Sequence, residues 1–322
     1  MWNPYKYLLG VVALLLLPGM VWAQTRLELP EQVFPGQPFM ARIVTDAPVG
    51  DVLVEWNGKS IPVPMREIRP AVQPGQTNAP EPPDSPDSSV SPGSPGSPNS
   101  PGQGGEWRGE VLLGVPYEQK GDSLSVRVTT VSPAGHNVYE RELTLRERVY
   151  PEQHLTVKNK YVDVARENLD RHAQERKRVV AALGSMRAER LWSVPFLRPV
   201  SGSVSSEYGL TRFFNGKPRN PHKGLDLRGA AGTPIRACAD GIVALAEEHF
   251  FAGNSVYLDH GQGVVTMYFH MRDIAVKPGQ TVRRGDVLGT VGSTGRVTGP
   301  HLHWGLAVQG ELVDPSPLLA DR

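Results

Sequence analysis

Two short segments in the last third of the chain contain residues that can bind a metal ion. His222 and Asp226 are four residues apart, and His301 and His303 are two residues apart. Side chains separated by an even number of positions lie on one face of a strand, and Gly224 permits a close backbone approach. Two imidazoles plus one carboxylate suit zinc, and three protein ligands leave a fourth position for a water molecule. The pattern therefore predicts a catalytic site with a metal-activated water.

A third histidine, His270, ends the segment Tyr268-Phe-His270. Alternation along this predicted strand puts Thr266, Tyr268 and His270 on one face, and we expect that face to line the same cleft. Spacing alone leaves open which of His301 and His303 would bind the metal.

Other residues in the same region favour structural roles. His260 follows Leu-Asp at a predicted turn. His249 precedes Phe250-Phe251, two aromatics that suit either the core or the wall of the cleft, and we favour the core. Cys238 is the one cysteine of the chain and lies in an apolar run, so a buried core position is expected and no disulfide can form within the chain. The loop containing Glu207-Tyr-Gly and Arg212 is a candidate for substrate contact.

Together these motifs resemble a known family. His222-x-Gly-x-Asp226, Tyr268-x-His270 and Gly299-Pro-His301-Leu-His303-Trp304 are similar to the signature of lysostaphin-like peptidases, also called LytM-domain proteins. The similarity covers roughly residues 195 to 319 and includes the segment from Pro278 to Asp286.

The resemblance implies a zinc-dependent endopeptidase of bacterial peptidoglycan with one zinc ion. By resemblance, His222, Asp226 and His303 are the metal ligands, while His270 and His301 are catalytic. The expected substrates are peptide cross-links, with the D-alanyl–diaminopimelate bond as the expected target.

Two alternatives belong to other classes. Some LytM-domain proteins have lost their metal ligands and activate other cell-wall hydrolases; all five family positions are present here, which argues against that role. The Pro278-Gly-Gln segment also resembles the hairpin of biotinyl and lipoyl carrier domains. No lysine stands at the expected hairpin turn, so we interpret this segment as a shared structural element.

The surrounding sequence predicts a mostly β protein in four parts. A signal peptide over 1–23 precedes an immunoglobulin-like β-sandwich over 24–149. A Pro/Ser/Gly-rich insertion over 70–105 interrupts the sandwich and is predicted to be disordered. A helical connector over 150–194, with a helix between Asp163 and Leu183 capped by Gly184, leads to an antiparallel β peptidase domain over 195–322.

Composition limits the partners of the protein. Its 322 residues include 34 basic and 33 acidic side chains, a balance that argues against nucleic acid. The expected partner is a peptidoglycan peptide, and the N-terminal β-domain could dock a regulatory protein. The signal-like segment predicts export, and the lack of a Gram-positive wall-targeting module favours the periplasm. An uncleaved segment would instead anchor the protein in the inner membrane.

Overall fold

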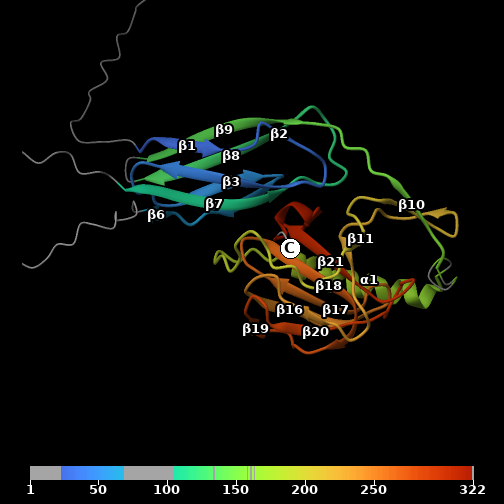
Figure 1. The fold of residues 1–322 in the computed structure, drawn as a ribbon. Helices are drawn as coiled ribbons and strands as arrows, with labels where there is room; N and C mark the ends of the chain where they lie inside the picture. Colours follow the sequence, from blue (N-terminus) through green and yellow to red (C-terminus); the bar gives the residue numbers. More distant parts are fainter. Residues whose placement is uncertain are drawn as a thin grey trace, which may run out of the picture.

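The computed structural model describes residues 23–68, 105–132, 135–157, 159, 162 and 164–320. The predicted signal peptide and the predicted disordered insertion lie outside these residues, except for positions 23 and 105 at their ends. Within the described chain the fold is mostly β, as predicted, with one α-helix (Figure 1).

The N-terminal part is a sandwich of two sheets around one hydrophobic core (Figure 1). Alternation builds that core: in β8, Val126 and Val128 are buried, while Ser125 and Arg127, which alternate with them, are exposed. The immunoglobulin-like topology stays a prediction. One sheet has the order β1 (Thr25–Glu28), β3 (Pro38–Thr45), β7 (Glu106–Gly114), β6 (Arg66–Ile68), and the other β2 (Gln32–Val33), β9 (Gly135–Leu145), β8 (Ser123–Ser132), β4 (Val52–Trp56), β5 (Lys59–Pro62).

The connector contains the predicted helix and one strand that the sequence did not predict. Helix α1 spans Arg166–Leu183 and ends at Gly184, the predicted cap. Before it, β10 (Glu152–Leu155) pairs in parallel with β12 (Thr211–Phe214), which pairs in turn with β13 (Lys217–Pro218). The connector therefore contributes a strand to the C-terminal half of the molecule.

The C-terminal part is a ten-stranded sheet in which every pairing is antiparallel, as predicted. Its core holds Tyr268 and Trp304, neither of which is exposed. The main order is β11 (Val204–Ser206), β14 (Leu225–Arg228), β21 (His301–Val308), β18 (Val264–Ile274), β17 (Gly253–Asp259), β16 (Gly241–His249), β19 (Thr281–Val282); β15 (Pro234–Arg236), β20 (Val287–Val291) and β22 (Glu311–Val313) lie off this path. A short 3₁₀ turn, η2 (Ser316–Leu318), follows.

The C-terminal end of β7 is buried on both faces, and this joins the two halves of the molecule. Val111 and Leu113 face the sandwich core, whereas Leu112 between them belongs to the core of the C-terminal sheet. Ion pairs flank this contact: Arg190 Nη1 lies 2.9 Å from Glu110 Oε2, and Arg148 Nη2 lies 3.0 Å from Asp314 Oδ2. The sandwich therefore packs directly against the sheet that carries the histidine motifs.

No helix among the described residues has both the length and the apolar character needed to cross a membrane.

The two ends of the insertion are neighbours in the sheet, because Ile68 of β6 pairs with Glu106 of β7. Deleting residues 71–104 would leave a three-residue hairpin loop, a common length. Loop-closure entropy then favours the shortened protein by no more than about 2 kcal/mol. We expect the thermal midpoint, measured by circular dichroism, to stay unchanged or rise by a few degrees. A clear fall would show that the deleted residues make stabilising contacts.

Candidate metal centre

Strand register brings the separated histidine motifs together. Asp226 of β14 pairs directly with His303 of β21, and His301 pairs with Arg228. His222 lies in the loop before β14, where its N–H donates to the carbonyl of Leu210 at 2.9 Å. The even spacing that the sequence analysis used for His222 and Asp226 thus spans a loop–strand junction.

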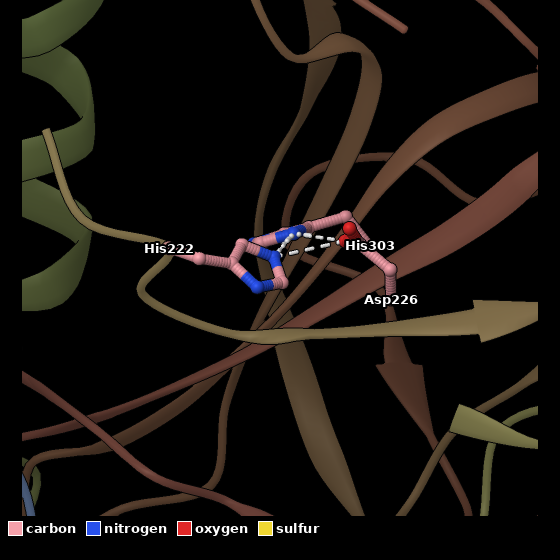
Figure 2. A group of neighbouring side chains, drawn as sticks. All are labelled: His222, Asp226 and His303. Carbon is pink, nitrogen blue, oxygen red and sulfur yellow. Dashed lines mark hydrogen bonds and ion pairs between the residues drawn. The ribbon is translucent and has the colours of Figure 1, made fainter. Parts of the chain in front are cut away.

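Three side chains converge at one point (Figure 2). Oδ1 of Asp226 lies 2.9 Å from Nε2 of His222 and 2.8 Å from Nδ1 of His303. The two ring nitrogens are 3.0 Å apart. His222 and Asp226 are buried, and His303 is half-buried. The three residues implied as ligands by resemblance are therefore neighbours, with His301 Nε2 slightly further out, 3.7 Å from Oδ1.

The hydrogen bond of His222 to the backbone determines which of its ring nitrogens carries the proton. Its Nδ1 lies 2.6 Å from the carbonyl oxygen of Glu207, which can only accept, so Nδ1 carries the proton. In the neutral ring, Nε2 then presents a lone pair to Oδ1 of Asp226 at 2.9 Å. A ring nitrogen of each imidazole and an oxygen of the carboxylate lie within 4.8 Å of one another, so the donor set fits a metal ion.

The charge states of the cluster agree with this interpretation. Burial works to raise the pKa of Asp226, but contacts with His222 and His303 outweigh it and hold the pKa well below its usual value. Burial lowers the pKa of His303 to about 4, against the opposing pull of Asp226. Near neutral pH the site therefore offers an ionised carboxylate and a neutral imidazole, the forms that bind metals.

A second partner occupies the other oxygen of Asp226. Nη2 of Arg212 lies 2.8 Å from Oδ2, and both side chains are largely buried. Arg212 was a candidate for substrate contact from its expected loop, whereas the structure places it against the carboxylate. The missed signal is Asn215-Gly216, a type of dipeptide that closes tight hairpins. Both residues have positive φ, and their turn connects β12 to β13.

His270 reaches the same site by an irregularity in β18. Its φ of 63° is left-handed, and its ring centre lies 5.0 Å from that of His301 and 6.1 Å from that of His303. The expectation that Thr266 and Tyr268 share its face is wrong. Both are fully buried on the core side, because the left-handed residue interrupts the alternation.

Phe269 takes the position at the site that alternation assigned to Tyr268. Its ring stacks on His303 with centroids 5.3 Å apart. A neighbouring loop supplies Phe251, which the sequence analysis placed in the core. Instead Phe251 lines the pocket beside the metal ligands, and the guanidinium of Arg296 lies between it and Phe214, 4.5 and 4.7 Å from the two rings.

A groove extends away from this pocket. It shares Asn220, Phe251 and Arg296 with the pocket, and Val164 and Leu169 of the connector line its other side. Together the two hollows form an elongated surface that suits a chain-like ligand.

Helix α1 holds the loop that carries Phe251. Glu175 is buried, its carboxylate accepts the N–H of Phe250 at 3.1 Å, and Arg171 lies 2.7 Å from it. The carbonyl of Ala252 in the same loop accepts the N–H of His270 at 2.9 Å. The connector helix thus supports one wall of the site.

Gly224 allows the close approach between its backbone and the site that the motif predicts. A Cβ at this position would lie 2.6 Å from Nε2 of His303. Any side chain there would displace the imidazole.

The residues given structural roles lie outside the site. His260 is fully buried, with Nδ1 2.6 Å from the carbonyl of Asp240 and Nε2 2.7 Å from Oγ1 of Thr266. His249 and Cys238 are also buried. The structural roles predicted for His260 and Cys238 are confirmed.

Comparison with known proteins agrees with the geometry. Residues 220–315, which include all five motif positions, match the model of Peptidase family M23. This part of the chain is an M23 peptidase domain. A solved Pseudomonas aeruginosa structure assigned to peptidase M23 is similar at 26% identity and a TM-score of 0.58, covering 89% of this chain and 94% of that one. The likeness therefore extends beyond the M23 domain into the sandwich.

Curated relatives match within the M23 domain. The peptidoglycan DD-endopeptidase ShyA of Vibrio cholerae is 47% identical over 94 residues, 29% of this chain and 22% of that protein. The DD-carboxypeptidase/endopeptidase Mpg of Neisseria meningitidis is 44% identical over 94 residues, again 29% and 22%. The match thus spans less than a quarter of the length of either relative.

The buried His260 behind the M23 site gives a pH-dependent prediction. Burial lowers its pKa to about 4 from an ordinary 6.5, so the unfolded chain binds this proton at a higher pH than the folded protein does. Stability is then lost as pH falls from 6.5 towards 4, by about 3 kcal/mol from this residue. His260→Gln removes that contribution. The difference in free energy of unfolding between the wild type and this variant should therefore be smaller at pH 4 than at pH 7 by this amount.

Urea denaturation at several pH values measures this gap. His136→Gln, which removes an exposed imidazole on β9, provides the baseline. A gap for His260→Gln that stays constant with pH would contradict the assigned cause.

Proposed function

We propose that the protein is a zinc-dependent endopeptidase that hydrolyses peptide cross-links of bacterial peptidoglycan, with the D-alanyl–diaminopimelate bond as its target. The observation that carries this proposal is the convergence of His222 Nε2, Asp226 Oδ1 and His303 Nδ1, which lie 2.8–3.0 Å from one another. It lies inside an M23 domain related to peptidoglycan DD-endopeptidases.

In this proposal His222, Asp226 and His303 hold the zinc and leave one position open. Bound zinc would lower the pKa of a water molecule and polarise the scissile carbonyl. Arg212, by binding the other oxygen of Asp226, keeps the carboxylate directed at the two imidazoles.

His270 and His301 are suited to proton transfer. Nδ1 of His270 lies 2.9 Å from the carbonyl oxygen of Thr294, and Nδ1 of His301 lies 2.8 Å from that of Gly299. Each carbonyl places the proton on Nδ1 and leaves Nε2 as the basic nitrogen. Burial and the neighbouring His301 and His303 lower the pKa of His270 well below its usual value. A neutral imidazole here can accept a proton from water or, once protonated, stabilise an oxyanion.

The shape and charge of the cleft support a peptide substrate. The pocket continues into the groove along the connector, which provides room for residues on either side of the scissile bond. Arg296 and Lys223 line the pocket, and Lys223 is also paired with Glu118 at 2.8 Å. The guanidinium of Arg296 suits the carboxylates of diaminopimelate-containing peptides. Peptidoglycan is reached outside the cytoplasm, so the same proposal places the protein in the periplasm, consistent with the signal-like segment.

The alternative of a non-catalytic LytM-type regulator requires a defective site. All five residues of the motif meet here, and this favours the enzyme. The sandwich, which packs against the M23 domain, is the part that we propose for docking a regulatory partner.

Metal dependence tests the central claim. The purified protein should contain one zinc ion per chain by atomic emission, and it should release soluble fragments from isolated peptidoglycan. Removal of the metal with a chelator should abolish release, and added zinc should restore it. Mass spectrometry of the fragments identifies the bond that is cut. Full hydrolysis by the metal-free protein would overturn the proposal, whereas bound zinc without hydrolysis would favour the regulator.

Single substitutions separate the two sets of histidines. His303→Ala leaves two protein ligands, so zinc content and hydrolysis should both collapse. His270→Ala and His301→Ala should keep zinc and lose turnover by about 10²–10⁴-fold, the usual contribution of a positioned acid or base. Zinc content and hydrolysis are measured on the same samples, with His249→Ala, whose ring lies outside the site, as control. Loss of zinc in His301→Ala but not in His303→Ala would reverse the assigned roles.

A further inference from the structure

Strand β10 brings a polar side chain to the back of the metal site. Gln153 is paired in register with Arg212 through the parallel ladder between β10 and β12. It comes from the connector, 67 positions before the start of the region that matches the M23 family at residue 220. The residue therefore belongs to the part of the chain that precedes the matched domain, and no motif indicated it.

The amide of Gln153 contacts the two residues that support the metal ligands. Its Oε1 accepts from Nε of Arg212 at 2.9 Å, and its Nε2 donates to Oγ of Ser206 at 3.1 Å. Arg212 also donates to the same Oγ at 3.1 Å. The three side chains form a closed triangle of hydrogen bonds.

Arg212 and Ser206, the other two residues of this triangle, each lie against a candidate metal ligand. Nη2 of Arg212 lies 2.8 Å from Oδ2 of Asp226, and Oγ of Ser206 lies 3.3 Å from Nδ1 of His222. Ser206 is also the register partner of Asp226 across β11 and β14. A single amide thus links the supports of two of the three ligands.

The geometry of Arg212 explains why a support matters. An arginine side chain has several rotatable bonds, and ordering it costs entropy. With Nε held by Gln153, the guanidinium has one orientation, in which it binds Oδ2 and leaves Oδ1 to the imidazoles. Without that support, the guanidinium can move and the carboxylate can rotate with it.

We propose that Gln153 is a positioning residue for the metal site, acting through Arg212 on Asp226. This inference rests on the proposed metal-dependent function. It means that the connector strand, in addition to joining two domains, completes the outer layer of the metal site.

The test measures zinc affinity in the full chain by competition with a chromophoric chelator. Gln153→Leu keeps the size of the side chain and removes both hydrogen bonds, and Gln153→Ser is a second variant in case the first does not fold. Zinc should bind about 10–100-fold more weakly, the usual effect of losing an outer-layer partner. Glu152→Ala, the exposed neighbour on β10, is the matched control and should bind zinc as the wild type does.

A double-mutant cycle shows whether the effect passes through Arg212. If Gln153 acts through Arg212, then Gln153→Leu combined with Arg212→Gln should bind zinc no more weakly than Arg212→Gln alone. The thermal midpoint of the metal-free Gln153→Leu protein should stay within a few degrees of the wild type. Cobalt substitution adds a spectroscopic measurement, because a reoriented carboxylate changes the visible absorption of the bound ion.

The outcomes separate this inference from the function on which it rests. A wild type that binds no zinc would overturn the proposed function itself. A wild type that binds zinc, with Gln153→Leu and Gln153→Ser binding equally well, would overturn only the role of Gln153. Losses that add fully in the double mutant would also overturn it, because Gln153 would then act independently of Arg212.

Discussion

The buried carboxylate of Asp226 is the constraint on which the rest of the site depends. An ionised carboxylate away from water is costly unless both of its oxygens have partners. Here the two oxygens have different partners, a guanidinium on Oδ2 and two imidazole nitrogens on Oδ1. The guanidinium offsets the negative charge on one side, and the other oxygen remains directed at the two imidazoles.

The sheet holds this carboxylate in place through strands on both sides. Asp226 on β14 pairs with His303 on β21 and with Ser206 on β11. Strand pairing fixes the backbone of all three residues, so their side chains need little additional ordering. The loop residue His222 lacks a ladder of its own and is held by two backbone hydrogen bonds and by the contact with the carbonyl of Glu207. Rigid strands and one tightly tied loop together produce a site that is arranged in advance.

The local sequence pattern predicted the parts of the site that lie within single regular strands. It failed for residues whose position depends on tertiary contacts or on an irregular backbone. The His301–His303 pair lies on one face because a regular strand repeats every two residues. Alternation misplaced Thr266 and Tyr268 because His270 adopts a left-handed conformation, which no spacing rule indicates. Phe251 was assigned to the core because it is aromatic, yet its loop is drawn to the site by Glu175 from a distant helix. Arg212 and Gln153 meet through a parallel pairing of strands 59 positions apart, a contact that leaves no trace in local sequence.

The same contrast applies to the N-terminal half. The strands of the sandwich were predictable from alternation. Its position against the C-terminal half was not, because the contact between them depends on a short apolar run in β7. In β7, Leu112 would point to solvent in a free sandwich, and instead it lies in the core of the C-terminal sheet. An apolar side chain on each face of one strand means that neither half buries its full hydrophobic surface alone. The connector is tied to the sandwich just before β10, because the hydroxyl of Tyr150 donates to the carbonyl of Pro35 at 2.7 Å, and two residues later the chain begins the strand that reaches the metal site.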